Sequence, residues 1–492
     1  MTNSINQEQK APYGIIAILF LGAFVAILNE TFLNVALPSI MDEFSVSPAT
    51  VQWLATGYML INGILIPASA FFIQRFTNRH IFLVAMGLFT LGTLLAGLSP
   101  SFGILLAARM IQASGSAIMM PLLMNVMLVA FPIEKRGQVM GFFGLVMIVA
   151  PAIGPTLSGY IVEHFSWRML FHIVLPFSII SLLYALFRLK NFTPQHKIKL
   201  DVLSLLLSSI GFGGLLYGFS SAGDIGWGNP WVYSTITAGS ISLVLLVLRQ
   251  FRLDEPLLEF RIFKYPMFAL SNAISVTVSL ALFSGMILIP LYIQTVRDFS
   301  PTEAGLLMLP GALVMGIMSP ISGRIFDKHG AKVMSIIGLS LLLITTFVFS
   351  NLSLTTSYFF VLIIFCIRAF AMSLVNMPVI TNGLNQLPAK DYPHGTALNN
   401  TLSQVAGAIG SALLVTVMNN RSEARLAELT QDPMEVVDPE STIDPAAQIA
   451  NHAMLNGINF SFFISALIVV VALVLAFFIK RVPITNPDPI EE

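Results

Sequence analysis

The sequence predicts an all-α polytopic membrane protein, and three observations predict it. Of the 492 residues, 56% are hydrophobic and only 10% are charged, and the mean hydropathy is +0.83. Soluble globular chains carry about 25% charged residues. The chain also contains repeated apolar stretches of about 20 residues, the length that a helix needs to cross a bilayer. Most side chains should therefore face lipid or the interior of a helical bundle.

The predicted spans are fourteen in number, with short polar loops between them. Their approximate limits are 14–37, 52–73, 81–98, 103–131, 138–162, 169–188, 201–220, 232–249, 267–294, 302–323, 333–350, 358–386, 396–418 and 457–479. An even number of spans places both termini on one side, and the excess of Lys and Arg in cytoplasmic loops decides which side that is. In this assignment 19 of the 25 Lys and Arg lie in the termini and the loops on the same side. Both termini are expected in the cytoplasm, with the chain in the cell membrane.

Composition also excludes several classes of function. The formal charge is zero and there is no basic tail, so nucleic acid is not an expected partner. Cys366 is the only cysteine, which excludes an internal disulfide and a cysteine-based metal cluster, and no metal or other cofactor is expected. The polar N-terminus leads into an apolar run without a small-residue cleavage site, which predicts a retained span and not a signal peptide.

An internal repeat divides the chain. At offsets of 252 or 253, the positions Pro38, Ser47, Pro48, Pro67 and Arg75 match Pro290, Ser300, Pro301, Pro320 and Lys328. The predicted units are an N-terminal six-helix bundle at 14–190, an inserted helix pair at 191–254, and a C-terminal six-helix bundle at 255–484 that includes a polar outer loop at 419–456. Parallel repeats are typical of transporters that rock two halves around a central site.

Three charged side chains lie well inside predicted spans, namely Glu30, Arg109 and Arg368. A charge at the centre of a membrane helix costs at least about 2.5 kcal/mol on the insertion scale, so such residues are functional candidates. A carboxylate moved out of water favours its neutral form. Glu30 is therefore expected to gain and lose a proton near neutral pH, as a proton-coupled carrier requires. The alternative is a permanent ion pair with Arg109 that only fixes the helices.

Arg109 should face polar partners, because arginine stays charged even when it is buried. Gln112, three residues later, shares its helix face. A structural clamp is an equally good interpretation of Arg109, and the two roles are compatible. In the fifth span Gly154 and Pro155 interrupt the helical hydrogen bonds, and Gly159 leaves room for a neighbouring backbone.

The loop GRIFDKHGAK, at 323–332 and starting at Gly323, is a candidate gating loop. Asp327 can cap the N-terminus of the next helix, Gly330 allows a tight turn, and Lys328 stays on the cytoplasmic side. A loop that binds a helix end in one arrangement only could bias a two-state equilibrium. The alternative is a solvated turn.

Six stretches in order resemble known sequence motifs. They are LNETFLNVALPSI, VQWLATGYML, RMIQASGSA, APAIGPTLSG, SWRMLFHIVLP and GTALNNTLSQVAGAIGSA. Together they resemble the Major Facilitator Superfamily (MFS), specifically its fourteen-span drug:proton antiporters of the EmrB/QacA (DHA2) group, and most of all its lincomycin-resistance-type exporters. The resemblance implies the MFS fold, with two six-helix bundles plus two additional helices. It also implies export through the fifth-span antiporter motif, and proton transfer that involves Arg109.

Two departures from the family pattern stand out. Many relatives have aspartate where this chain has Asn29, and the acid is displaced by one position to Glu30. One residue turns a helix by about 100°, so the carboxylate should face a different direction. The first gating loop, which carries Arg75 and Arg79, is degenerate at Gln74 and Thr77, where the family prefers an acid and a glycine. Gating is therefore expected to depend on the second loop.

These inferences predict a monomeric, proton-driven antiporter that exports amphipathic drugs by alternating access. Many Met, Phe and small residues and few charges suit a promiscuous cavity. The candidate polar lining residues are Asn34, Tyr58, Gln112, Asn125, Asn376, Asn400 and Gln404. One alternative is a dedicated exporter or flippase for a single endogenous lipid or metabolite. Another is a membrane-embedded enzyme or sensor, for which the chain offers no nucleotide loop, metal cluster or nucleophile–base pair.

Overall fold

Helices make up all the regular structure that the computed structural model describes, which covers residues 13–46, 48–51, 53–189, 191, 200–431 and 444–481. The α-helices are α1 (Tyr13–Phe44), α2 (Pro48–Val51), α3 (Trp53–Arg75), α4 (Asn78–Gly97), α5 (Phe102–Ala130), α6 (Ile133–His164), α7 (Met169–Arg188), α8 (Val202–Ile225), α9 (Pro230–Gln250), α10 (Pro266–Leu291), α11 (Pro301–His329), α12 (Ala331–Phe349), α13 (Tyr358–Leu384), α14 (Tyr392–Gln431) and α15 (Pro445–Ala476). Two 3₁₀ turns, η1 (Phe260–Lys264) and η3 (Ala389–Asp391), and a π-helical turn, η2 (Tyr292–Val296), complete the set.

Twelve of the described helices are long and apolar enough to cross a membrane. This agrees with the predicted all-α polytopic class. In α1 the described apolar stretch, Ala17–Leu33, is too short to be counted among these twelve. The total of fourteen spans therefore stays a prediction.

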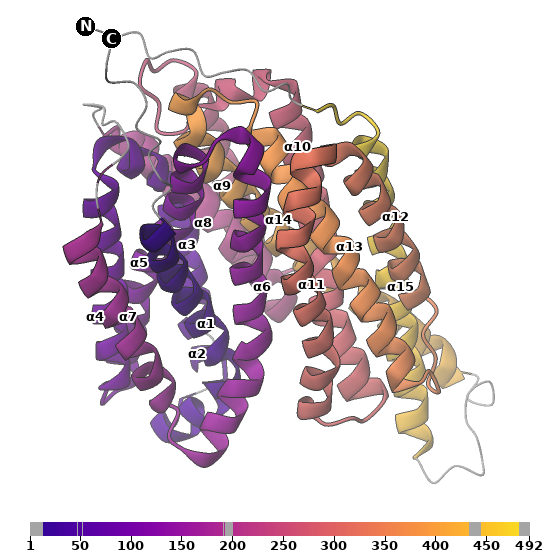
Figure 1. Cartoon of the computed structure of the whole chain (residues 1–492). Helices are drawn as coiled ribbons and strands as arrows, with labels where there is room; N and C mark the ends of the chain where they lie inside the picture. The colour runs from indigo at the N-terminus through magenta and orange to yellow at the C-terminus, as the bar shows by residue number, and fades with distance from the viewer. Residues whose placement is uncertain are drawn as a thin grey trace, which may run out of the picture.

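The helices form two groups that stand side by side (Figure 1). In the first group α4 and α5 pack together, and α1 packs against α6 and α7; in the second, α11 and α12 pack on α13, and α10 packs on α14 and α15. The most extensive packing in the molecule joins the groups, between α6 and α11. The exact division of the chain into units stays a prediction, because helix packing does not set domain boundaries.

Glycines allow the close contact between α6 and α11. A Cβ atom on Gly323 would lie 2.0 Å from the carbonyl oxygen of Gly137, and one on Gly141 would lie 2.5 Å from the carbonyl oxygen of Ser319. Both distances are far below contact range. No larger residue fits at these positions while the helices keep this separation.

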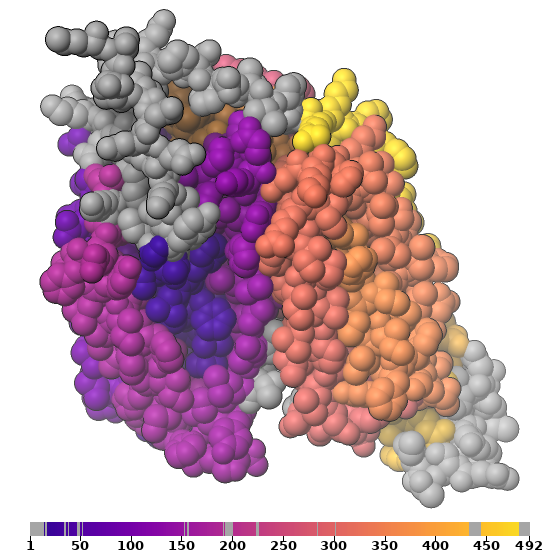
Figure 2. Space-filling model, viewed as in Figure 1, coloured from indigo at the N-terminus to yellow at the C-terminus, as the bar shows by residue number. Residues whose placement is uncertain are grey.

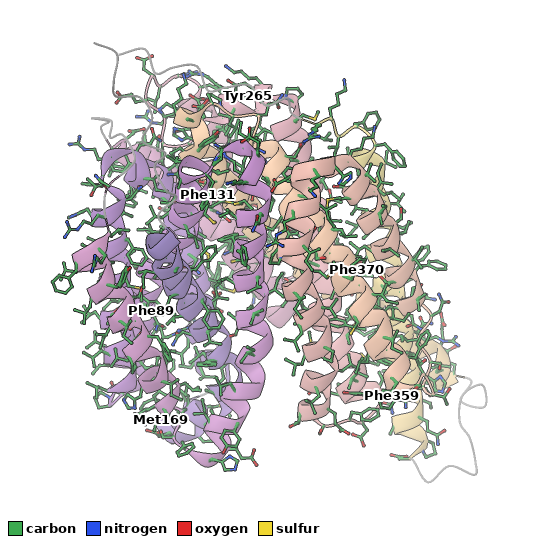
Figure 3. The ribbon with its side chains drawn as sticks, viewed as in Figure 1. Phe89, Phe131, Met169, Tyr265, Phe359 and Phe370 are labelled. Carbon is green, nitrogen blue, oxygen red and sulfur yellow. The ribbon has the colours of Figure 1, made fainter. Side chains whose placement is uncertain are left out.

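The groups meet mainly at one end of the molecule, which we call the closed end: it holds the first residues of α1 and the last residues of α15. Hydrogen bonds cross between the groups here, from Arg136 to Tyr392 (2.8 Å) and between Gln74 and His394 (2.8 Å). A single hydrophobic core runs from the first group into this end of α13 and α14. Phe131 and Tyr265 lie toward the closed end and Met169 and Phe359 toward the opposite end (Figure 3).

At the opposite end the two groups separate. Figure 2 shows a notch between the lower parts of the first and second groups. The hydrogen bonds that join described residues of α1–α7 directly to described residues of α10–α15 lie toward the closed end. We call the opposite end the open end.

The pair α8 and α9 lies beside the groups and contacts both, because α8 packs on α3 and on α14. Its closed end is fixed by an ion pair between Asp201 and Arg249 (2.7 Å). The hydrogen bond from Arg249 lowers the pKa of Asp201 to about 2. The pair therefore stays ionised as the pH falls from neutral to well below 4.

Helical structure extends into both ends of the predicted polar segment at 419–456, whose first part the sequence already allowed to be a short amphipathic helix. Helix α14 continues to Gln431, and α15 begins at Pro445. The sequence RSEARLAEL is rich in helix-forming residues, and Arg425 pairs with Glu428 one turn later (3.0 Å). The helices thus extend beyond the apolar stretches that define the spans.

Candidate functional site

A buried arginine organises the interior of the first group. Arg109 on α5 is 1% exposed, and its Nη1 donates to Asn29 Oδ1 on α1 (2.6 Å) and to Gln112 Oε1. Gln112 in turn donates to Thr93 on α4 (2.7 Å). The guanidinium carbon lies 4.3 Å from the ring centre of Tyr58 on α3. One side chain thus ties together α1, α3, α4 and α5.

Glu30 follows Asn29 on α1 but does not share its partner. The side chain of Glu30 is partly exposed, whereas Asn29 is 1% exposed. Glu30 lies close enough to Arg109 and Tyr58 to interact with both electrostatically, yet the described residues show no ion pair between Glu30 and Arg109. In this conformation the neutral Asn29 occupies the position of a counter-ion, and the carboxylate stands beside it.

The predicted antiporter motif packs directly against this part of α1. A Cβ atom on Gly154 would lie 2.1 Å from the hydroxyl oxygen of Thr31, the residue after Glu30. One turn later Ser158 donates to the carbonyl oxygen of Phe32 (2.7 Å). The side chain of Pro155 lies outside the described part of the structure. Gly159 was expected to admit a neighbouring backbone, and this is wrong: a Cβ atom there would have no neighbour within 4 Å, because α1 contacts the other face of α6.

Arg368 occupies the equivalent place in the second group. From α13 it donates to the carbonyl oxygen of Ala281 on α10 (2.8 Å) and to the hydroxyl of Thr346 on α12. Ala281 follows Asn29 by 252 positions, and Thr346 follows Thr93 by 253, the offsets of the sequence repeat. Leucine stands at position 282, the counterpart of Glu30. Among the residues that the structure describes, a carboxylate thus acts on Arg109 but none acts on Arg368.

The predicted lining residues are divided between several environments. Tyr58 and Gln112 belong to the buried Arg109 cluster, and Asn125 is 2% exposed. Asn400 donates to the carbonyl oxygen of its own helix at Thr396 (3.0 Å), and Gln404 is exposed. The side chain of Asn34 lies outside the described part of the structure.

Asn376 lines a small cavity of about 20 Å³ between the two groups. Three methionines share its wall, Met147 on α6, Met315 on α11 and Met377 on α13. Methionine is flexible and polarisable, so this wall can adapt to apolar groups of different shape.

Comparison with known proteins identifies the family. Residues 19–411 match the model of the Major Facilitator Superfamily. The chain belongs to this superfamily. It is 48% identical over 445 residues to the uncharacterized MFS-type transporter YhcA of Bacillus subtilis, which covers 90% of this chain and 82% of YhcA. It is 40% identical over 487 residues to the lincomycin resistance protein LmrB of Bacillus subtilis, which covers 99% of each.

The superfamily fold is also found in solved structures. The proton:xylose symporter XylE superposes with a TM-score of 0.61 at 14% identity, over 95% of this chain and 96% of XylE. The chain is therefore a multi-pass MFS membrane transporter and not an enzyme.

The second predicted gating loop, whose residues up to His329 belong to α11, joins the two groups. Asp327 accepts hydrogen bonds from the backbone amides of Gly137 (2.9 Å) and Gln138 (3.0 Å) on α6. The expected cap on the next helix is wrong: α12 begins after Gly330, whose φ of +77° suits a tight turn. Asp327 therefore bonds to the helix of the opposite group instead of its sequence neighbour.

The first gating loop makes a different contact. Arg75 and Arg79 are exposed, and Arg79 donates to the carbonyl oxygen of Leu186 on α7 (2.6 Å). Gln74, which replaces the expected acid, reaches His394 at the start of α14. The first loop is thus joined to the second group by a hydrogen bond between Gln74 and His394. The second loop is joined to the first group by the carboxylate of Asp327.

Sequence reasoning missed several residues of the closed end. Arg136, 7% exposed, donates to Asn385 (3.1 Å) after the end of α13 and to Tyr392 at the start of α14, and His394 is 6% exposed. These residues lie in predicted loops, where charge is ordinary. Their burial depends on contacts more than 200 positions away, which no local pattern reveals.

Proposed function

We propose that the transporter is a proton-coupled antiporter that exports amphipathic drugs from the cytoplasm across the cell membrane. The observation that carries the proposal is the pair of charges in the first group. Glu30 is partly exposed beside the fully buried Arg109, and the second group has a matching arginine without an acid. One exchangeable carboxylate near the middle of a bundle is what proton coupling needs.

The closed end faces the cytoplasm in this proposal, because the predicted cytoplasmic loops carry most of the Lys and Arg. The structure then corresponds to an outward-open state. Rocking of the two groups would break the contacts of Asp327, Arg136 and Gln74 and open the cytoplasmic side. The closed end also holds close packing between α6 and α11 and part of a shared hydrophobic core, so new contacts at the opposite end must offset what rocking breaks if the two states are to lie close in free energy.

Coupling follows from competition between the proton and the substrate. A proton that arrives from outside neutralises Glu30 and promotes substrate release outward. Deprotonation toward the cytoplasm prepares the carrier for the next substrate. Each positive charge that moves inward gains about 2.3 kcal/mol per 100 mV, which can drive uphill export. The proton gradient takes the place of a cofactor, and the monomer is the working unit.

The relatives support an amphipathic drug as the substrate. LmrB, which matches 99% of this chain, is named for lincomycin resistance. The cavity of about 20 Å³ between the groups is too small for a drug in this conformation, and the methionines and Asn376 around it would line a substrate site only when the groups move apart.

Transport in proteoliposomes with an imposed pH gradient tests the proposal, with lincomycin and a fluorescent amphipathic dye as probes. We expect wild-type protein to accumulate probe in response to the gradient. Glu30→Gln should lose at least 90% of that accumulation, because glutamine cannot exchange a proton and loss of a positioned proton-transfer group typically costs about 10²- to 10⁴-fold. Glu163→Gln, an exposed glutamate near the end of α6, is the matched control. Gradient-driven transport by Glu30→Gln at the wild-type rate would contradict the proposal.

Resistance profiling separates the proposal from a dedicated exporter. Cells that express the transporter should tolerate several chemically unrelated amphipathic drugs. Protection against a single compound class would support the alternative of one endogenous lipid or metabolite.

A further inference from the structure

Three hydrogen-bond donors around Arg109 lack an acceptor. They are Nδ2 of Asn29, the hydroxyl of Tyr58 and Nε of Arg109, and all three atoms are buried. Ser116 on α5 can donate to the Tyr58 oxygen, which leaves the Tyr58 proton without an acceptor. The side chains that carry them touch one another, because Arg109 bonds to Asn29 and lies over the ring of Tyr58. Buried polar groups are nearly always paired, so three unpaired donors in one cluster call for an explanation.

The chemistry of the three atoms indicates what could pair with them. The amide and guanidinium nitrogens only donate, and a tyrosine hydroxyl donates readily. The missing group must therefore be rich in acceptors. An ionised carboxylate is such a group, since its two oxygens accept up to about four hydrogen bonds and donate none.

Glu30 is the carboxylate within reach. It follows Asn29 on α1 and interacts electrostatically with Arg109 from α5 and Tyr58 from α3. The other described ionisable residues on α6 and α7, which also pack on α1, lie nearer the ends of those helices, and Asp42 and Glu43 lie at the end of α1. No other acid on these elements can fill the role.

We propose that Asn29, Tyr58 and Arg109 form a receptor for the ionised side chain of Glu30. Protonated Glu30 remains outside the receptor, partly exposed as in this structure. When its O–H bond breaks and the proton passes to water, the carboxylate turns inward and accepts from the three donors. Tyr58 is therefore a positioning residue for proton exchange and not a lining residue of the substrate cavity. The inference rests on the proposed proton coupling.

The receptor predicts how proton affinity responds to mutation. Hydrogen bonds to the charged form of an acid favour that form. Removal of one donor should therefore make Glu30 hold its proton more tightly, and proton release should shift to higher pH. Tyr58→Phe is the cleanest change, because it removes one hydroxyl and keeps the ring over Arg109.

The experiment measures the carbonyl stretch of protonated Glu30 by infrared difference spectroscopy from pH 5 to 9, in purified protein. The band is assigned by its absence in Glu30→Gln. We expect Tyr58→Phe to move the midpoint of its disappearance upward by about one pH unit, a tenfold change in proton affinity. Ser114→Ala is the control, because Ser114 is a hydroxyl on the same helix as Arg109 that donates to the backbone carbonyl of Met110 (2.9 Å) and has no place in the receptor.

Two outcomes would overturn the inference. One is an unchanged midpoint in Tyr58→Phe, as expected if water alone satisfies the donors. The other is an equal shift in Ser114→Ala, which would show a general effect of lost polarity. The infrared midpoints do not depend on transport, so the two proposals can fail separately. If wild-type protein shows the expected midpoints but no uptake in response to a pH gradient, the proposed function is refuted and the receptor still stands. Thermal unfolding of each variant verifies that it is folded.

Discussion

At the scale of single residues, Arg109 bonds to Asn29 and not to the neighbouring Glu30. Asn29 holds Arg109 without neutralising it, and in the proposed mechanism the carboxylate at position 30 exchanges the proton. A buried charge that lost its partners would be strongly destabilised. Arg109 is therefore fixed by neutral groups, and the titratable group is separate from the group that fixes it.

Replacement of Arg109 by lysine should impair transport more than stability. Lysine keeps the charge but lacks the planar fork that bonds to Asn29 and Gln112, so the first group loses its alignment around Glu30. We expect gradient-driven uptake in proteoliposomes to fall about tenfold, as for loss of one positioned group worth about 1.4 kcal/mol.

Arg368→Lys is the matched control for that change. It loses equivalent bonds in the second group, where no carboxylate lies beside the arginine. Its effect on the pH dependence of uptake should be small. Equal changes of the pH profile in both variants would contradict a special role for Arg109.

At the scale of elements, α6 has a different function along each half of its length. Near its start it packs on α11 through Gly137 and Gly141, and farther on it packs on α1 through Gly154 and Ser158. The same helix thus contacts α11, which carries Asp327, and α1, which carries Glu30. A rigid shift of α6 would move both together, which gives a physical route from the protonation of Glu30 to the gate.

A larger residue at Gly323 should open the closed end. Valine there would clash with the backbone of Gly137, and overpacking typically costs about 1–3 kcal/mol. That cost falls on the closed state and corresponds to a population shift of about 5- to 150-fold. We expect faster labelling by a thiol reagent at a cysteine introduced at position 138, in a Cys366→Ser background.

Gly305→Val on the same helix is the control. A Cβ atom at position 305 meets nothing within 4 Å, so this variant should label at the background rate. Similar acceleration in both variants would point to general loosening of α11 and not to the contact with α6.

At the scale of the whole molecule, the asymmetry of the two ends defines the conformation. Bonds between the groups gather at the closed end, and the groups part at the open end (Figure 2). Helix α8 contacts α3 and α14 together, so the inserted pair follows both groups and covers their junction on one side. Alternating access requires the closed end to separate.

A covalent link across the closed end should therefore stop transport. The side-chain tips of Gln74 and His394 (both Nε2) lie 2.8 Å apart. Cysteine side chains are much shorter, so cysteines at both positions, in a Cys366→Ser background, should be joined by a short bifunctional methanethiosulfonate reagent and not by a direct disulfide. We expect uptake to fall at least tenfold in the cross-linked double variant, the transport barrier rising by more than about 1.4 kcal/mol, and to recover when the reagent is released by reduction. The two single variants are the controls. Full activity of the cross-linked protein would exclude rocking at this end.

The sequence by itself determined the class, the family and most of the helices. Apolar length, the offset of 252 or 253 and the six motifs depend on local composition and spacing, which a single chain displays directly. Glu30 and Arg109 could be selected in the same way, because a charge within an apolar span is costly wherever the helix lies.

Only the tertiary structure decided the partners of these residues. It placed Asn29 and not Glu30 on Arg109, moved Asp327 from its neighbour α12 to α6, and brought Arg136 and His394 into the closed end. Each of these contacts depends on how two helices are rotated and how far apart they stand. Rotation and separation come from packing between distant segments, so no local pattern in the sequence specifies them.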